Sequence, residues 1–310
     1  MEIKTVTLIG CGAVGCLYGA RLQEVSDLQV VASGKRLERY RTEGLFLNGK
    51  KVGFTYVSPE EAKATDLVII ATKNLQLTEA IEEMKNAVGK DTVIMSLLNG
   101  IESEGHVAEK YGQEKMLYSY AVGLSSMHDG NHITSTSEGK IVFGEKDNRK
   151  TERVEAIASL FRRCGIAYEI PEDIQLSMWK KFMLNTAFNT LSSITWSGYG
   201  DFKEPALQTL VRKVSDEVIA VAHAEGITLT KAMVEESIAM ITHLEANGMT
   251  SMFQDMVAGR NTENEFFCGT VVHLGEKHKI PTPVCETLCL LVKGCERSRQ
   301  RALKEQVHFS

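Results

Sequence analysis

The sequence has no surplus of positive charge, since its 310 residues include 35 Lys and Arg against 40 Asp and Glu, a net charge of −5. Proteins that bind nucleic acid usually carry a basic surface, so this balance argues against that class. The sequence also has no apolar run long enough to cross a bilayer. Its first residues read directly into a strand pattern, without the charged and apolar regions of a signal peptide. We therefore expect a cytoplasmic protein that binds neither nucleic acid nor membrane.

The sequence contains no Cys-x-x-Cys pair, although it has seven cysteines. Three of them, Cys285, Cys289 and Cys295, are spaced by four and six residues, which suggests that they share one helix. Their spacing does not match the ligand pattern of a zinc site. We expect reduced, buried thiols and no bound metal.

The first half of the chain alternates between strand and helix patterns. Residues 66–72 and 92–98 are continuous apolar runs, which are typical of parallel strands buried on both faces. Helical patterns at residues 13–25 and 77–88 alternate with these strands. This order predicts an α/β fold whose N-terminal part is a Rossmann-type, doubly wound parallel sheet.

Other segments predict antiparallel strands. A hairpin is expected with Asn48 and Gly49 at its turn, because this dipeptide favours the tight turns that join two strands. The segments on either side of Gly139, residues 131–138 and 140–145, are predicted to be two antiparallel strands.

The pattern changes near residue 171. Strand patterns nearly vanish after an edge strand predicted at residues 166–170, and helical periodicity continues to the end of the chain. Pro171 would end that strand, and the acidic residues behind it would begin a helix. We therefore predict a Rossmann domain at residues 1–170 and an all-helical domain at residues 171–310.

A glycine-rich loop joins the first predicted strand to the first helix. It consists of Gly10, Cys11, Gly12, Ala13, Val14 and Gly15. In a dinucleotide-binding loop the first glycine permits the tight turn, the second lets the backbone approach a pyrophosphate, and the third allows close packing of helix and strand. The N–H groups at the helix start would then bind the phosphates. The alternative is a glycine turn without a ligand.

The end of the second strand favours NADP over NAD. A site for NAD usually has Asp or Glu there, which binds the ribose hydroxyls. This chain has Ser33 instead, followed by Lys35 and Arg36. Ser33 can donate a hydrogen bond to a 2′-phosphate, and the two cations can supply charge. The alternative is that Lys35 and Arg36 only begin a solvated helix.

The segment MWKKFMLNTAFN reads as a helix in which Lys181, Asn185 and Asn189 follow one another at steps of four. Four residues advance by about 40° around a helix, so the three form a slanted stripe, with Phe182 and Phe188 beside it. Each residue alone could be an ordinary surface residue. Together they predict a polar cleft for a small oxyanion, because an ammonium can protonate a developing alkoxide and amides can bind hydroxyl and carboxylate groups.

The order of these features resembles the ketopantoate reductase (2-dehydropantoate 2-reductase) family over nearly the whole chain. The matching segments are IGCGAVG, ATKNLQ around Lys73, LNG around Asn99, WKKFMLNTAFNTL, SMFQD with residues 260–263 behind it, and IPTP near the end. The family has a Rossmann domain followed by a helical domain, with the active site between them. The resemblance implies reduction of 2-dehydropantoate by NADPH, which gives pantoate for pantothenate and coenzyme A synthesis.

The resemblance also implies roles for residues of the helical domain. Lys181 would be the general acid, and Asn185 and Asn189 would bind the oxygen functions of the substrate. Ser251 would hold the substrate carboxylate. Glu263 would lie near the ribose of the cofactor or the substrate hydroxyl.

In the Rossmann domain, the resemblance implies that the cofactor contacts Lys73, Asn99 and the backbone near Ser126. Asn99 would also reach the substrate. Lys73 and Asn99 each follow a predicted buried strand, and ligands bind at the carboxyl ends of such strands. The alternative for Asn99 is an ordinary turn.

Two of the implied roles have simpler alternatives. Thr262 and Glu265 fit a capping box, so Glu263 could be only a first-turn acid that the helix dipole favours. Ser251 and Gln254 fit the same pattern, so Ser251 could be only a helix cap.

The chain departs from the family pattern at Ser33, where many relatives carry Arg, and at Cys285, where many carry Asn. Asn is also common in the family near Tyr199, where this chain reads SGYGD. These departures leave another small 2-oxo acid open as the substrate. A β-hydroxyacid dehydrogenase fits less well, because no glycine stretch precedes Lys181. A non-catalytic NADP-binding sensor would need the glycine loop but not the Lys-Asn-Asn stripe. The sequence does not fix the oligomeric state and is compatible with a homodimer.

Overall fold

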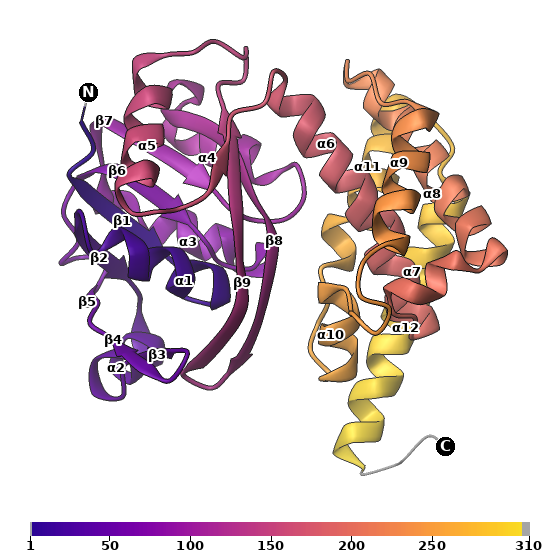
Figure 1. Cartoon of the computed structure of the whole chain (residues 1–310), viewed down its shortest axis with the longest axis horizontal. Helices are drawn as coiled ribbons and strands as arrows, with labels where there is room; N and C mark the ends of the chain where they lie inside the picture. Colours follow the sequence, from indigo (N-terminus) through magenta and orange to yellow (C-terminus); the bar gives the residue numbers. More distant parts are fainter. Residues whose placement is uncertain (1, 306–310) are drawn as a thin grey trace. The chain divides into compact units, whose positions relative to one another are not determined.

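The computed structural model describes residues 2–305, apart from the side chains of residues 127 and 128. The chain divides into two compact units between Gln175 and Leu176. The first unit holds strands and helices, and the second is built from helices (Figure 1). The predicted α/β fold with a helical second part is therefore confirmed. The division falls in the first turn of a helix, shortly after the joint predicted at Pro171.

The elements of the first unit are short and follow one another closely. Its strands are β1 (Thr5–Ile9), β2 (Asp27–Val31), β3 (Leu45–Leu47), β4 (Lys50–Val52), β5 (Thr55–Val57), β6 (Thr65–Ile70), β7 (Val88–Ser96), β8 (Met116–Asp129), β9 (His132–Gly144) and β10 (Tyr168–Glu169). Its α-helices are α1 (Ala13–Leu22), α2 (Gly34–Thr42), α3 (Leu77–Glu83), α4 (Ser103–Tyr111) and α5 (Glu152–Arg163). Three short 3-10 turns complete it, namely η1 (Asn74–Gln76), η2 (Lys85–Ala87) and η3 (Gln113–Lys115).

Six parallel strands form the Rossmann part of the sheet, in the order β5-β2-β1-β6-β7-β8. The chain runs from β1 outward to β2 and β5, and then returns to β6 on the other side of β1. The register places Ile9, the last residue of β1, opposite Val31 on one side and Ile70 on the other. In open α/β sheets, ligands bind at the carboxyl ends of the strands, where the strand order reverses. The glycine loop follows β1 at that point.

Helices cover both faces of this sheet because its inner strands are apolar on both sides. Leu67 and Ile69 of β6 pack in one cluster with side chains of α1 and α5. Val68 and Ile70 lie on the opposite face, in a cluster with side chains of α3 and α4. Since these four side chains are fully buried, each stabilises the fold by about 1.5–3 kcal/mol. The prediction of a doubly wound sheet is confirmed.

The ribbon of β8 and β9 corrects one prediction. The two segments beside Gly139 are not a pair of strands, because they belong to one strand, β9, which runs antiparallel to β8. Gly139 has a φ of +59° and lies within the ladder rather than at a turn. A Cβ atom at Gly139 would lie 2.2 Å from the carbonyl oxygen of Val122 in β8. Glycine is needed here for close approach of two backbones, which in the sequence looks the same as a turn.

The hairpin predicted at Asn48 and Gly49 is confirmed, since β3 and β4 pair antiparallel around it. Both turn residues have positive φ, 49° and 78°, as a type I′ turn requires. β5 does not extend this hairpin and instead pairs parallel with β2. The strand predicted just before Pro171 is present as β10, which pairs with β9.

The described residues of the second unit form helices joined by loops, without a strand. Its elements are α6 (Ile174–Leu184), the π-helical turn η4 (Asn185–Asn189), α7 (Thr190–Thr195), η5 (Tyr199–Lys203), α8 (Pro205–Ala224), α9 (Lys231–Thr242), α10 (Ser251–Val257), η6 (Asn264–Phe266), α11 (Cys268–His278) and α12 (Pro283–Lys304). As predicted, Cys285, Cys289 and Cys295 share one helix, α12, as free thiols. The first two are buried.

Replacing Gly139 by Ala tests the role of its close contact. The variant should lose more than the roughly 1–2 kcal/mol expected for a left-handed backbone alone, because its Cβ also meets the Val122 carbonyl. Gly130 is a matched control, since its φ is +58° but a Cβ there has no neighbour within 4 Å. Urea denaturation of Gly139→Ala and Gly130→Ala gives the two free energies of unfolding. Equal losses would contradict this account of β9.

Candidate functional site

The glycine loop is shaped by two close backbone contacts. Gly10 has a φ of +88°, and a Cβ there would lie 2.5 Å from the methyl carbon of Thr72, in the loop after β6. A Cβ on Gly15 would lie 2.2 Å from the carbonyl oxygen of Gly10. The first glycine therefore allows the turn, and the third allows α1 to begin directly against the end of β1.

Gly12 differs from Gly10 and Gly15, because a Cβ built on it would have no atom within 4 Å. It precedes α1, whose first turn contains no acidic residue. The first N–H groups of a helix have no acceptor within the helix, and the helix dipole favours an anion there. The open space and these donors fit the pyrophosphate of a dinucleotide.

The other residues of the loop contribute backbone rather than reactive side chains. Cys11 is buried, and burial and its hydrogen bond with Cys16 raise the pKa of its thiol. Ala13 and Val14 are half-buried and pack against the core under the sheet. A ligand above Gly12 would therefore meet main-chain N–H groups.

Three further loops lie at the same edge of the sheet as the glycine loop. The Asn74 side chain donates a 2.8 Å hydrogen bond to the carbonyl oxygen of Asn99, which joins the loops that follow β6 and β7. Lys73 directly precedes Asn74 and is exposed. Ser33 follows β2, the parallel neighbour of β1. The structure thus brings the Ser33, Lys73 and Asn99 loops to the edge where the glycine loop lies.

Ser126 lies elsewhere in the first unit. It belongs to the ribbon, where its ladder partner is Ser135 in β9. Ser126 is nine residues further along β8 than Leu117, which pairs with β7. The strand pairings do not bring it to the four loops. The contact of Asn74 with Asn99, in contrast, was not expected from the sequence, since it joins side chain and backbone across two loops.

Lys35 and Arg36, the two cations predicted to serve a 2′-phosphate, differ in their surroundings. The Arg36 guanidinium lies 3.4 Å from a carboxylate oxygen of Glu79 and 3.4 Å from one of Glu83, both on α3. The side chain of Glu83 is only 8% exposed, so this charge needs its partner. Lys35 is exposed and has no ion-pair partner among residues 2–305. Of the two cations, Lys35 is the one available to an added phosphate.

In the second unit, the helix that carries Lys181 is not a regular α-helix. Residues Asn185–Asn189 form a π-helical turn between α6 and α7, so the predicted helix is present but is not α-helical throughout. In a π-helix each N–H bonds the carbonyl five residues before it, so one full turn takes more than four residues instead of about 3.6. The drift of about 40° between Lys181 and Asn185 is therefore not repeated between Asn185 and Asn189. Such turns are frequent at functional sites.

The two amides are nearly enclosed, whereas the lysine reaches solvent. Asn185 is 8% exposed and Asn189 is 6% exposed, while Lys181 is partly exposed. Phe182 and Phe188, the aromatic residues beside the predicted stripe, are each 1% exposed. These rings hold the helix in the core of the unit, and the polar stripe lies at the edge of that core.

Ser251 lies next to Asn189 and does not cap its helix. Thr250 is the cap of α10, since its hydroxyl accepts a 3.2 Å hydrogen bond from the N–H of Phe253. The Ser251 hydroxyl is left to accept a 3.3 Å hydrogen bond from the Asn189 amide. The structure therefore brings together two of the residues expected at the substrate, and the capping alternative for Ser251 is wrong.

Glu263 is buried at the start of η6, with 7% of its surface exposed. The capping box considered for Thr262 and Glu265 is absent. The Thr262 hydroxyl instead accepts a hydrogen bond from the N–H of Asn264, and the Thr262 N–H donates to Glu296.

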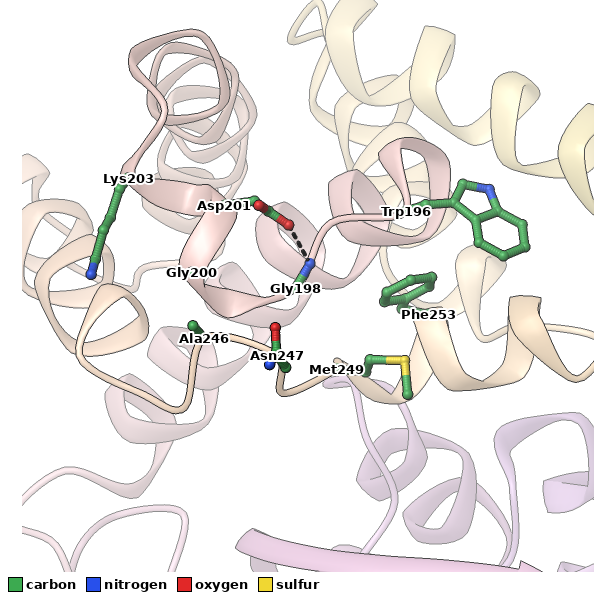
Figure 2. A pocket seen from close by; sticks show the side chains of 9 residues that line it. All are labelled: Trp196, Gly198, Gly200, Asp201, Lys203, Ala246, Asn247, Met249 and Phe253. Carbon is green, nitrogen blue, oxygen red and sulfur yellow. Dashed lines mark hydrogen bonds between the residues drawn. The ribbon is translucent and has the colours of Figure 1, made fainter. Parts of the chain in front are cut away.

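A hollow of about 400 Å³ lies in the second unit, between the loop after α7 and the loop before α10. Figure 2 shows Trp196 and Phe253 at one end and Lys203 at the other. Trp196 is 49% exposed and has a left-handed backbone, with a φ of 59°. Its ring packs at 79° against that of Phe253, with 5.7 Å between centroids. No sequence pattern indicates this hollow, because a left-handed tryptophan has no pattern of its own.

The two loops around the hollow are held together by glycines. A Cβ on Gly198 would lie 2.6 Å from the Ala246 carbonyl oxygen, and one on Gly200 would lie 2.7 Å from the Ala246 side chain. The Gly198 N–H also donates to the Asp201 carboxylate at 2.8 Å (Figure 2). The walls are therefore fixed by backbone contacts.

Comparison with known proteins gives the family. The model of the family described as "Ketopantoate reductase PanE/ApbA" matches residues 6–148, and that of its C-terminal part matches residues 173–296. The protein belongs to the ketopantoate reductase family. A 2-dehydropantoate 2-reductase of Archaeoglobus fulgidus is 31% identical over 302 residues, which cover 96% of this chain and 99% of that protein. The chain is thus an oxidoreductase of this family.

Solved structures agree with this assignment. A PanE/ApbA family ketopantoate reductase from Ralstonia eutropha JMP134 has a TM-score of 0.83 at 26% identity, over 96% of this chain and 99% of that one. D-mandelate dehydrogenase, in a ternary structure with NADH and anilino(oxo)acetate, shares the fold with a TM-score of 0.84. Its identity is 24%, over 95% of this chain and 99% of that one. Among residues 2–305, no helix is both long and apolar enough to cross a membrane.

Gly12→Ala and Gly15→Ala should separate ligand approach from folding. Gly12→Ala should keep the melting temperature near that of the wild type, because its Cβ has no neighbour, but weaken NADPH binding by about tenfold or more. Gly15→Ala should lower the melting temperature, because its Cβ meets the Gly10 carbonyl. Thermal unfolding and fluorescence titration with NADPH measure the two effects. Unchanged binding by Gly12→Ala would contradict the assignment of this loop.

Proposed function

We propose that the protein reduces 2-dehydropantoate to pantoate with NADPH, as a step of pantothenate and coenzyme A synthesis. The observation that carries the proposal is the contact of Asn189 with Ser251. Asn189 lies on the same helical segment as Lys181. This segment offers one cation and two amides, and Ser251 of α10 adds a hydroxyl, to a small substrate with a carboxylate and a keto group. Relatives named 2-dehydropantoate 2-reductase support the choice of substrate.

Each candidate site residue of the helical unit has a proposed role. Lys181 donates a proton from its Nζ atom to the keto oxygen as negative charge develops there. Asn185 and Asn189 donate amide hydrogens to oxygen atoms of the substrate, which adds no charge to the site. Ser251 donates its hydroxyl hydrogen to the carboxylate. Glu263 is proposed to contact the ribose or the substrate hydroxyl.

The first unit is proposed to hold the cofactor. When bound, the reduced nicotinamide supplies the hydride. Main-chain N–H groups of residues 10–15 bind the pyrophosphate, and Ser33 and Lys35 bind the 2′-phosphate. Lys73 and Asn99 complete the contacts, and Asn99 also reaches the substrate. The contact with the backbone near Ser126 stays a prediction of the resemblance, because the strand pairings do not bring Ser126 to these loops. A cytoplasmic location and a homodimer remain predictions from the sequence.

Another small 2-oxo acid is the second candidate substrate. The hollow beside Trp196 and Phe253 favours it, because these rings offer an apolar wall in the same unit as Ser251. Asn is common in the family near Tyr199, whose hydroxyl here donates at 3.2 Å to the carbonyl oxygen of Met249, a residue that lines the hollow. The Tyr199 side chain thus holds the loop that carries Met249.

Lys181→Ala tests the proposed proton donor. It should lower kcat by about 10²–10⁴, the usual contribution of a general acid, while NADPH binding stays close to that of the wild type. Lys180→Ala is a matched control, because Lys180 is the neighbouring cation and pairs with Glu236 at 3.3 Å on the surface. Turnover is followed as loss of NADPH absorbance with 2-dehydropantoate.

The same assay separates the alternatives. Normal turnover by Lys181→Ala would exclude Lys181 as the acid. Turnover by the wild type with another 2-oxo acid, but not with 2-dehydropantoate, would change the substrate and keep the mechanism. NADPH binding without turnover of any 2-oxo acid would favour a non-catalytic sensor.

Two variants test the preference for NADPH. Lys35→Ala should raise the Kd for NADPH by about tenfold and leave that for NADH unchanged, because it removes one charge-assisted contact to the 2′-phosphate. Arg36→Ala should change the Kd for NADPH less, since its guanidinium already lies between Glu79 and Glu83. Titration of each variant with both cofactors gives the four constants. A larger effect of Arg36→Ala, or tighter binding of NADH by the wild type, would contradict this assignment.

A further inference from the structure

Two buried hydroxyls connect the helix that carries Asn189 to the helix that carries Ser251. Ser192 of α7 and Thr250, the cap of α10, lie with their oxygen atoms 2.5 Å apart. Ser192 is 0% exposed and Thr250 is 4% exposed. Neither belongs to the stripe of Lys181, Asn185 and Asn189, and neither is reached by solvent.

The hydrogen bonds around this pair can run in only one direction. Thr250 Oγ1 accepts from the N–H of Phe253 at 3.2 Å, and Ser192 Oγ donates to the carbonyl oxygen of Asn189 at 3.1 Å. A hydroxyl has a single hydrogen, so Ser192 cannot also donate to Thr250. Thr250 must therefore donate to Ser192. The result is a chain that starts at the N–H of Phe253 and ends at the main chain of Asn189.

This series of hydrogen bonds begins in α10 and also returns to α10, through the side chain of Asn189. The side chain of Asn189 donates to Ser251, the residue after Thr250, at 3.3 Å. Four residues, Asn189, Ser192, Thr250 and Ser251, thus form a closed ring of contacts between α7 and α10. The buried hydroxyls set the backbone positions from which the Asn189 amide and the Ser251 hydroxyl extend.

We propose that Ser192 and Thr250 are positioning residues, which hold Asn189 and Ser251 at the separation that the substrate carboxylate requires. The inference rests on the proposed function, because it assigns a purpose to the Asn189 and Ser251 pair. Ser192 and Thr250 do not touch the substrate, since they lie behind the pair in the core. Their loss should weaken substrate binding and leave the protonation step at Lys181 in place.

Four single variants test the proposal. Ser192→Ala and Thr250→Val each remove one hydroxyl and nearly keep the volume, whereas Thr250→Ser keeps the hydroxyl. Ser193→Ala is the matched control, because Ser193 is also 0% exposed on α7 but its hydroxyl donates only to the Thr190 carbonyl of its own helix, at 2.8 Å. The measurements are kcat and KM for 2-dehydropantoate, the Kd for NADPH and the melting temperature.

Ser192→Ala and Thr250→Val should each raise KM by about tenfold, the effect of one lost hydrogen bond, and change kcat and the Kd for NADPH less than about twofold. The double variant should resemble the single ones, because either change breaks the same chain. Thr250→Ser and Ser193→Ala should have a KM near that of the wild type. A structural effect alone would lower the melting temperature of Ser193→Ala and Ser192→Ala alike.

Two outcomes would overturn the proposal. One is an unchanged KM in Ser192→Ala and Thr250→Val, and the other is an equal rise in KM for Ser193→Ala. Both assume a wild type that oxidises NADPH with 2-dehydropantoate. If the wild type turned over neither that acid, 2-oxoisovalerate nor pyruvate, the proposed function would fall first, and the positioning role would fall with it.

Discussion

The arrangement of the helical unit depends on a single inserted turn. The π turn at Asn185–Asn189 interrupts a helix that would otherwise carry its polar residues gradually around to the core. The interruption has a cost in regular hydrogen bonding, and the buried rings of Phe182, before the turn, and Phe188, within it, offset that cost. Asn185 and Asn189 can then be enclosed and still lie on the side of Lys181. The contact of Asn189 with Ser251 and the buried bridge behind it both follow from this one irregularity.

In the first unit, the candidate cofactor site depends on close backbone contacts of the glycine loop. Its glycine loop brings α1 within van der Waals distance of the end of β1, so that the free N–H groups of the helix point away from the strand. No acidic side chain stands in the first turn to compete with a phosphate. Both candidate sites therefore rely on backbone geometry that only certain small or enclosed residues permit, and the charged side chains contribute selectivity.

The sequence predicts the features that repeat or that have a fixed spacing. Continuous apolar runs identify β6 and β7, and the glycine spacing identifies the loop, because both patterns arise from local geometry. The strand β9 was misread, since Gly139 serves a contact with Val122 that lies far away in the sequence. The π turn leaves the residue pattern unchanged and alters only its hydrogen bonds. The pairing of Arg36 with Glu79 and Glu83 is likewise a tertiary contact that no spacing indicates.

The same reasoning explains why the family is easier to assign than the substrate. The side chain of Tyr199 contacts residues that lie far from it in the sequence. A Cβ on Gly248 would lie 2.7 Å from the Tyr199 ring, so the ring and this glycine must vary together. The ring in turn fixes the loop that carries Met249, which lines the hollow beside Trp196. Tyr199 and Gly248 thus hold together the two loops beside the hollow. The shape of this hollow depends on Tyr199, Gly248 and Trp196 together, which no single motif residue encodes.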